Sequence, residues 1–125
     1  MKKIIVTGGT GYIGSHTAVS LIEQGFEVVI IDSLVNSEKS VLDGIENITG
    51  VRPIFYGIDL RNEAAVYEVL KAHQDTIAVI HFAALKAVGE SVNKPVLYYK
   101  NNLLALLNLL EGMQKYQINN IVFSS

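Results

Sequence analysis

The sequence contains no cysteine, no tryptophan, only two prolines among its 125 residues, and no marked excess of charge of either sign. Without cysteine, these residues can form no disulfide framework, no thiolate metal site and no cysteine nucleophile. Ten basic and twelve acidic residues give a formal charge of −2. This balance gives no electrostatic reason to expect nucleic acid or an anionic membrane as a partner. We also expect no metal site.

Long apolar runs are absent as well. The longest apolar stretch, residues 103–110, is interrupted by Asn108 and is far shorter than the roughly 20 residues that span a bilayer. The basic start, residues 1–3, is followed by too short an apolar segment for a signal peptide. We therefore expect a cytoplasmic protein. Half of the residues are hydrophobic, which is enough to build a folded core in a single domain over residues 1–125.

Short β-rich runs alternate with helical patterns along the whole chain. The strands are expected at residues 3–6, 27–31, 53–56, 77–81 and 119–124, and the helices at 13–24, 38–49, 63–73 and 96–116. Runs that are apolar on both faces are typical of a parallel sheet covered by helices on each side. Right-handed crossovers and a glycine turn after the first strand favour a Rossmann-like, doubly wound α/β fold with strand order 3-2-1-4-5. Ligands of such sheets bind beyond the carboxyl ends of the strands.

A glycine-rich turn joins the first strand to the first helix. Residues 7–14 read Thr-Gly-Gly-Thr-Gly-Tyr-Ile-Gly, with spaced glycines at Gly8, Gly11 and Gly14. A pyrophosphate binds the free N–H groups at a helix N-terminus, and the backbone approaches it closely only where no Cβ intervenes. Between a buried strand and an amphipathic helix, this spacing indicates a dinucleotide site. The alternative is a tight turn without a ligand.

Two carboxylates follow the second and third strands. Asp32 lies 18 residues after Gly14, where an acidic side chain accepts hydrogen bonds from the adenosine ribose and would repel the 2′-phosphate of NADP. This favours NAD as the cofactor. Asp59 follows the third strand, where a side chain can reach the adenine edge. The alternative for both residues is a helix cap or turn.

Several segments resemble the extended short-chain dehydrogenase/reductase family, and within it the 4-epimerases that act on UDP-glucose. The similarity lies in residues 7–16, 32–37, 57–63, 79–91, 98–102 and 123–125. The stretch Leu-Lys-Ala-Val-Gly-Glu-Ser at 85–91 is more specific than the glycine turn, which the whole superfamily shares. The resemblance implies that NAD acts as a transient oxidant while UDP-glucose and UDP-galactose interconvert through a 4-keto sugar. The alternatives are a related epimerase or dehydratase reaction and a bare dinucleotide-binding module.

The resemblance also implies which residues contact NAD. They are the turn and helix start, the segment that wraps the adenine ribose, the pair that brackets the adenine, the wall beside the pyrophosphate and nicotinamide ribose, and one amide of the long helix. By number they are Gly8, Gly11, Tyr12, Ile13, Gly14, Asp32, Ser33, Leu34, Val35, Asn36, Ser37, Asp59, Leu60, Phe82, Ala83, Ala84, Leu85, Lys86 and Asn101. Ala84 departs from the glycine frequent in the family. We interpret His81 as a packed core histidine.

The family requires a Tyr-x-x-x-Lys pair, in which the ammonium lowers the pKa of the phenol. The match in this sequence, Tyr67 with Lys71, is expected to be an exposed pair on a helix that runs away from the carboxyl edge. We therefore assign no catalytic residue within residues 1–125. The catalytic Tyr, Lys and Ser are expected past Ser125, together with a C-terminal domain that binds the UDP-sugar substrate. The chain is then a cofactor-binding part, truncated after the fifth strand and inactive alone.

The helix around residues 103–110 is apolar over much of its circumference, more than packing on one sheet face requires. The family pairs subunits through helices in this region, so the resemblance implies a homodimer. The alternative is that other parts of the same chain cover this face.

Overall fold

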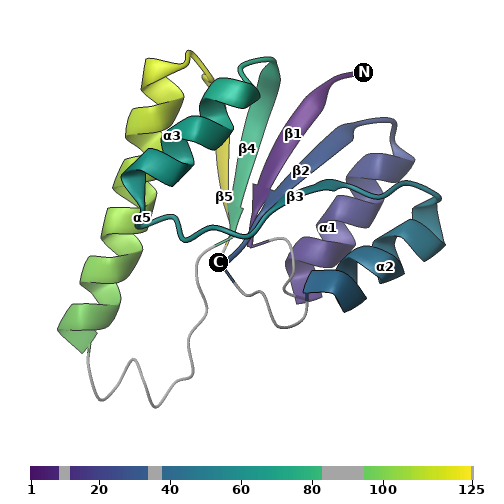
Figure 1. Cartoon of the computed structure of the whole chain (residues 1–125), viewed down its shortest axis with the longest axis horizontal. Helices are drawn as coiled ribbons and strands as arrows, with labels where there is room; N and C mark the ends of the chain where they lie inside the picture. Colours follow the sequence, from purple (N-terminus) through teal and green to yellow (C-terminus); the bar gives the residue numbers. More distant parts are fainter. Residues whose placement is uncertain (9–11, 34–37, 83–94, 125) are drawn as a thin grey trace.

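The computed structural model describes residues 1–8, 12–33, 38–82 and 95–124. This part of the chain forms a five-stranded parallel sheet in the order β3-β2-β1-β4-β5 (Figure 1), which confirms the predicted Rossmann-like topology. In chain order the elements are β1 (Lys3–Thr7), α1 (Tyr12–Glu23), β2 (Glu27–Ile31), α2 (Glu38–Thr49), β3 (Ile54–Tyr56), α3 (Glu63–Ala72), β4 (Thr76–Phe82), α5 (Pro95–Lys115) and β5 (Ile121–Ser124).

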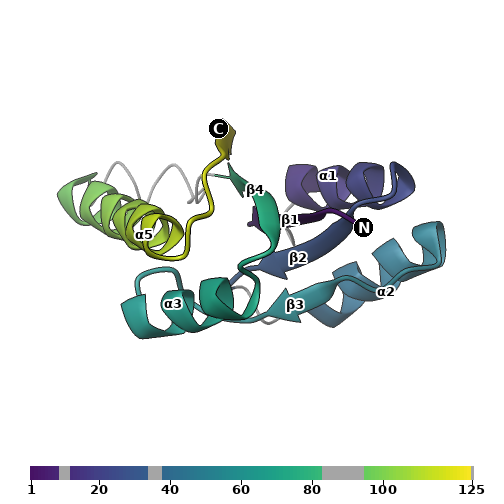
Figure 2. The ribbon, with the colours of Figure 1, turned by 90° about the horizontal axis from the view of Figure 1, so that it is seen from above.

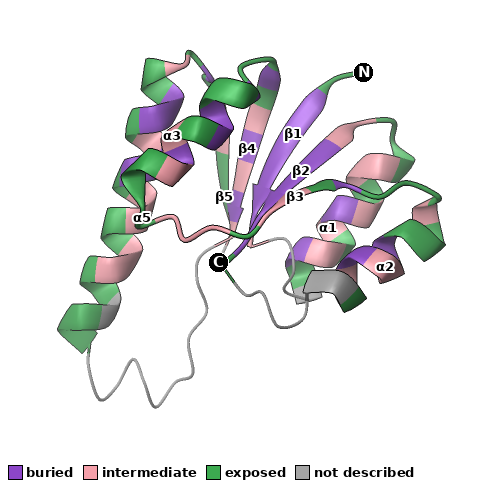
Figure 3. Cartoon of the chain, in the orientation of Figure 1, coloured by how far each residue is buried: buried purple, intermediate pink, exposed green. Residues whose placement is uncertain are grey.

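The two faces of the sheet are covered by different helices. Figure 2 shows α1 and α2 on one side of the strands and α3 and α5 on the other. Because side chains alternate along a strand, Ile5 belongs to the core under α3 and α5, whereas Ile4 and Val6 belong to the core under α1 and α2. Figure 3 shows the strands β1 and β2 buried along most of their length. The sheet is thus a rigid layer from which the loops at its edges extend.

Local sequence signals set the helix ends. Gly25 follows α1 with φ +93°; its N–H donates to the carbonyl of Ile22 at 3.0 Å, and the N–H of Phe26 donates to Leu21 at 3.0 Å. This is the Schellman pattern, in which glycine adopts the left-handed conformation. Asn62 precedes α3, and its side-chain oxygen accepts from the N–H of Ala65 at 3.2 Å. Gly25 thus caps the end of α1, and Asn62 caps the start of α3.

The strand boundaries differ slightly from those expected. β4 runs from Thr76 to Phe82, one residue longer at each end than predicted, and β5 begins at Ile121 rather than at residue 119. The preceding Asn120 still ties the chain to β4, because its carbonyl accepts from Val79 at 2.9 Å and its side chain donates to Ile77 at 3.0 Å. None of the described helices is long and apolar enough to cross a membrane. The cytoplasmic location stays a prediction.

A polar network closes the amino-terminal edge of the sheet. The buried ammonium of Lys3 lies 2.9 Å from Nδ1 of His73 and 3.0 Å from Oδ1 of Asp75. The other ring nitrogen of His73 lies 2.8 Å from the hydroxyl of Tyr56. Since an ammonium can only donate, Nδ1 of His73 accepts, and the ring is neutral with its proton on Nε2. Burial and the Lys3 charge both lower the pKa of His73.

Candidate functional site

The carboxyl-terminal edge of the sheet brings together residues that lie far apart in the sequence. The parallel register pairs Thr7 with Ile31 on one side and with His81 on the other, and it pairs Ile31 with Tyr56. The segments that follow β3, β2, β1 and β4 therefore begin side by side, in that spatial order. Figure 1 shows the strands converging toward this edge.

Gly8 is the first residue after β1. Its backbone has φ +75°, a conformation that side chains other than glycine rarely adopt, and its N–H donates to the carbonyl of Ile31 at 2.8 Å. A Cβ at this position would lie 3.1 Å from Cβ of Phe82 and 3.4 Å from its carbonyl oxygen. Gly8 is therefore required both by its conformation and by the close approach of β1 and β4. The predicted contact at Gly11 lies outside the described residues.

The N-terminus of α1 lies directly after this turn. The helix begins at Tyr12 and carries no acidic residue in its first turn. No carboxylate of that turn therefore neutralises the positive end of the helix dipole. Ile13 is 51% exposed in the first turn, whereas Gly14 is buried. The positive end of the α1 dipole thus lies at the carboxyl edge without an acidic side chain in its first turn, which suits an anionic ligand.

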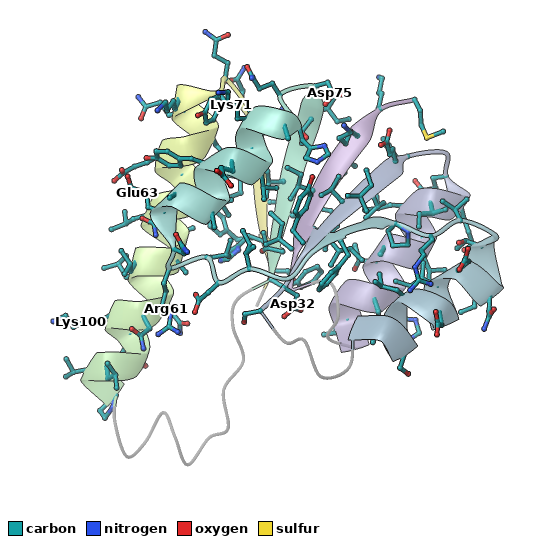
Figure 4. The ribbon with its side chains drawn as sticks, in the orientation of Figure 1. Asp32, Arg61, Glu63, Lys71, Asp75 and Lys100 are labelled. Carbon is teal, nitrogen blue, oxygen red and sulfur yellow. The ribbon has the colours of Figure 1, made fainter. Side chains whose placement is uncertain are left out.

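Asp32 follows β2 at the same edge. Its N–H donates to the carbonyl of Tyr56 at 3.1 Å, which extends the pairing of β2 with β3 by one residue, and the residue is 8% exposed. Figure 4 shows Asp32 at the opposite end of the sheet from Asp75. The next residue, Ser33, is exposed. The remaining predicted contacts of this segment, Leu34, Val35, Asn36 and Ser37, lie outside the described residues.

The loop after β3 is held in shape by its own side chains. Both carboxylate oxygens of Asp59 accept from Nε of Arg61, at 3.1 and 3.0 Å, and Oδ2 also accepts from Nη2 at 2.6 Å. The N–H of Arg61 donates to the same carboxylate at 2.9 Å, and the N–H of Asn62 donates to the Asp59 carbonyl at 2.9 Å. The pairing raises the pKa of Arg61. The Asp59 side chain remains 42% exposed, so the carboxylate is both ordered and accessible.

Two asparagines of α5 have different environments. Asn101, for which the resemblance implies a cofactor contact, is partly exposed near the start of the helix. Asn108 is 4% exposed, and its Nδ2 donates to the carbonyl of Leu60 at 2.9 Å. The sequence signal for Asn108 was an amide in a leucine-rich helix, a poor choice for helix stability, but it did not identify the partner.

His81 is buried at the end of β4, as expected of a core histidine, but it is also hydrogen-bonded. Its Nδ1 lies 2.6 Å from Oγ1 of Thr7, and its ring meets that of Phe123 edge-on with centroids 6.2 Å apart. Burial lowers its pKa. His81 therefore links β1, β4 and β5 immediately beneath Gly8. Sequence reasoning missed Thr7 because its partner comes from a strand 74 residues away.

Tyr67 is placed differently from the expected exposed pair with Lys71. It is half-buried against α5: Nζ of Lys115 lies 5.2 Å from its ring centroid, the ring of Tyr116 lies edge-on at 6.3 Å, and Glu111 accepts from its hydroxyl at 3.4 Å. Desolvation and the nearby carboxylates raise the pKa of Tyr67. A proton-abstracting tyrosine needs the opposite shift, so the rejection of this pair as catalytic agrees with the geometry.

The predicted contacts at Ala83, Ala84, Leu85 and Lys86 lie outside the described residues. Within the described ranges, no three His, Cys, Asp or Glu side chains gather in a way that could hold a metal ion. The described part of the site therefore consists of the Gly8 turn, the start of α1, Asp32, the Asp59–Leu60 loop and the end of β4.

Several curated proteins similar to this chain are UDP-glucose 4-epimerases. The chain is 53% identical over 122 residues to that of Schizosaccharomyces pombe and 52% identical over 122 residues to that of Yersinia pestis, in each case over 98% of this chain. It spans 34% and 36% of those relatives, about a third of their length. It is also 51% identical to a UDP-glucose 4-epimerase of Klebsiella pneumoniae, of which it covers 88%.

Solved structures give the same result. A UDP-glucose 4-epimerase of Stenotrophomonas maltophila with bound NAD and formylated UDP-arabinopyranose superposes with a TM-score of 0.90 at 45% identity, over all of this chain and 37% of that one. The enzyme of Bifidobacterium longum in complex with NAD+ and UDP gives 0.91 at 44% identity, over 99% and 37%. Residues 4–125 match the model of the NAD dependent epimerase/dehydratase family. The chain therefore belongs to the NAD dependent epimerase/dehydratase family.

Proposed function

We propose that residues 1–125 are the NAD-binding part of an enzyme that interconverts UDP-glucose and UDP-galactose by 4-epimerisation. The proposal is supported by about 50% identity to UDP-glucose 4-epimerases across almost the whole chain. Because the chain spans about a third of those relatives, we assign the UDP-sugar-binding domain and the proton-transferring Tyr, Lys and Ser to a later part of the protein.

The observation that carries the proposal is the spatial order of four strand ends at the carboxyl edge. Asp59 and Leu60 follow β3, and Asp32 follows β2; we assign them to the adenine and to its ribose. Gly8 follows β1 and is assigned to the pyrophosphate, and Phe82, which ends β4, is assigned to the nicotinamide ribose. Neighbouring strands lie about 4.8 Å apart, so the four ends span roughly 14–15 Å. An extended dinucleotide can lie along such a row.

The described residues fit this cofactor in two respects. Gly8 adopts φ +75° and lies against Phe82, so β1 ends in a tight turn directly before α1, as a turn that brings a pyrophosphate to a helix N-terminus requires. A buried carboxylate at Asp32 accepts from ribose hydroxyls and repels a 2′-phosphate, so we propose NAD rather than NADP. The full proposed set of contacts is Gly8, Gly11, Tyr12, Ile13, Gly14, Asp32, Ser33, Leu34, Val35, Asn36, Ser37, Asp59, Leu60, Phe82, Ala83, Ala84, Leu85, Lys86 and Asn101.

When bound, NAD supplies a reversible hydride acceptor for a sugar carbon. The part of these residues is to bind and orient. The Arg61–Asp59 pair orders the loop after β3, which we assign to the adenine, and the Thr7–His81 bond joins the ends of β1 and β4 next to Gly8. Neither contact involves Tyr67, which packs against α5. Its raised pKa also does not suit proton abstraction.

The proposal is tested on the complete polypeptide that contains residues 1–125. We expect it to convert UDP-glucose into UDP-galactose and to bind NAD in calorimetric titration. Asp32→Ala should weaken NAD binding by about tenfold or more, the loss of a charge-assisted hydrogen bond, and should narrow the preference over NADP. Asp43→Ala, which removes an exposed carboxylate of α2 paired with Arg52, is the matched control and should change neither.

The outcomes separate the alternatives. NAD binding without conversion of UDP-glucose, but with conversion of another sugar nucleotide, would indicate a related epimerase or dehydratase. NAD binding without any conversion would indicate a bare dinucleotide-binding module. Absence of NAD binding would contradict the site itself.

We also propose that the complete protein is a homodimer paired through α5. Outward-facing apolar residues of this helix are more than 40% exposed: Val96, Leu97, Tyr99, Leu103, Leu104 and Leu107. Leu103→Glu should shift the protein to the monomer in light scattering, because a charge cannot be buried unpaired in an apolar interface. Gln114→Glu, at an exposed position of the same helix two turns beyond Leu107, is the control. If both variants and the unsubstituted protein have the monomer mass, other parts of the same chain cover this face.

A further inference from the structure

Asn108 is an unusual residue for its position. It lies in the leucine-rich stretch of α5 and is 4% exposed, although an asparagine stabilises a helix poorly and a buried amide costs free energy unless it is hydrogen-bonded. Its Nδ2 donates to the backbone carbonyl of Leu60 at 2.9 Å, across 48 residues of sequence. The bond therefore joins the middle of α5 to the loop that leaves β3.

Other hydrogen bonds of this loop join residues within it. Arg61 and Asn62 both donate to Asp59, so these bonds fix the local shape of the loop but not its orientation toward the rest of the molecule. The side chain of Leu60 packs against the core under α3 and α5. The bond from Asn108 adds a directional constraint, because it fixes the plane of the peptide between Leu60 and Arg61.

The helix that carries Asn108 is a rigid support. α5 packs closely against α3 at Gly112, where an added Cβ would lie only 2.6 Å from Cδ1 of Leu70 and 3.1 Å from the ring of Tyr67. Leu109 and Met113, on either side of Gly112, are buried in the same core. Asn108 is thus held at a fixed height above the β3 loop by the packing of its own helix.

From this geometry we propose that Asn108 is a positioning residue for the adenine end of the dinucleotide. It acts through the carbonyl of Leu60 and does not touch the cofactor itself. The bond holds Asp59 and Leu60 at the place where they bracket the adenine, so its loss weakens binding of the adenosine half selectively. The inference rests on the proposed function, because it requires a dinucleotide at the carboxyl edge.

The experiment compares three ligands on the complete polypeptide: NAD, ADP-ribose and nicotinamide mononucleotide. Asn108→Leu keeps the branched shape of the side chain and removes the donor. We expect it to weaken the binding of NAD and ADP-ribose by roughly two- to tenfold, since one net hydrogen bond contributes about 0.5–1.5 kcal/mol and 1.4 kcal/mol is tenfold, and to leave the binding of the mononucleotide unchanged. Met113→Ala, which removes buried apolar volume from the same helix, should lower the melting temperature while preserving the ratio between ligands.

The possible results distinguish a failure of the proposed function from a failure of the inference about Asn108. If the unsubstituted protein binds none of the ligands, the proposed function fails. If it binds NAD but Asn108→Leu loses no affinity, or loses it equally for ADP-ribose and the mononucleotide, the inference about Asn108 is overturned. Should Asn108→Leu fail to fold, Asn108→Asp replaces the donor by an acceptor. Its ADP-ribose affinity, relative to the unsubstituted protein at the same pH, should be lowest at pH 8 and rise toward pH 5, because burial raises the pKa of a carboxyl at this position and the protonated acid can donate. A constant ratio would overturn the inference.

Discussion

Replacing Gly8 with alanine should destabilise the protein through two separate effects. At φ +75° an alanine costs about 1–2 kcal/mol relative to glycine. Its Cβ would also lie 3.1 Å from Cβ of Phe82, inside the ordinary carbon–carbon separation of about 3.5–4.0 Å. β1 and β4 would have to separate slightly, and such overpacking costs about 1–3 kcal/mol. The expected loss in the free energy of unfolding is therefore about 2–5 kcal/mol.

Two other glycines separate these effects. Gly50 has nearly the same conformation, φ +76°, but a Cβ there would meet nothing within 4 Å, so Gly50→Ala should lose only the conformational part, about 1–2 kcal/mol. Gly112 lies in α5 without a positive φ, but its Cβ would lie 2.6 Å from Leu70. Gly112→Ala should lose only the contact part, offset by about 1 kcal/mol of gained helix propensity.

The three variants are unfolded in urea, with unfolding monitored by far-UV circular dichroism, and each is also titrated with NAD. The free energy of unfolding of Gly8→Ala should be lower than that of Gly50→Ala by at least about 1 kcal/mol. Of the three variants, only Gly8→Ala should lose most of its affinity for NAD. If Gly8→Ala and Gly50→Ala unfold at the same urea concentration, the contact with Phe82 has no energetic weight. If all three variants bind NAD equally well, the turn is not part of the site.

Two further changes test other parts of the structure. Because the pKa of His73 is lowered in the folded chain, the unfolded chain binds a proton more readily, so the free energy of unfolding should be highest above about pH 6.5 and fall as the pH drops below it. His73→Gln should reduce this pH dependence in urea titrations between pH 5 and 8, and His81, whose pKa is also lowered, should account for the dependence that is left. An unchanged pH dependence would contradict the assignment. In the complete polypeptide, Tyr67→Phe should leave the proposed epimerase activity unchanged and the unfolding free energy within about 0.5 kcal/mol. An inactive variant would show that Tyr67 takes part in proton transfer.

The fold could be predicted because its signals are local. The apolar run of β2, Glu27–Ile31, is buried on both faces as expected of a central parallel strand, and the caps at Gly25 and Asn62 lie where their residue types predict them. The strand starts were less accurate because they depend on backbone pairing with residues far away in the sequence. Thr76 is buried at the start of β4 opposite Lys3, and nothing near it in the sequence predicts that pairing.

The candidate site could be predicted only in part, for the same reason. The Gly8 turn and Asp32 are recognisable from spacing along the chain, since each lies directly after an apolar strand. Asn108 and His81 are not, because their roles depend on partners 48 and 74 residues away. Register and helix packing supply those partners. A sequence pattern can show that a buried polar residue is unusual, but only the fold shows what it holds.

The two edges of the sheet differ in whether protein groups neutralise the positive charge there, and this difference supports the proposed position of the ligand. At the amino-terminal edge, the buried Lys3 ammonium has His73 and Asp75 as partners, and His73 is in turn bonded to Tyr56. Protein groups therefore satisfy the charge there, and the network contributes to stability. At the carboxyl edge, Gly8 holds the turn close to Phe82, and α1 begins without an acidic residue in its first turn. A helix start of this kind favours an anionic ligand, in agreement with the proposed function.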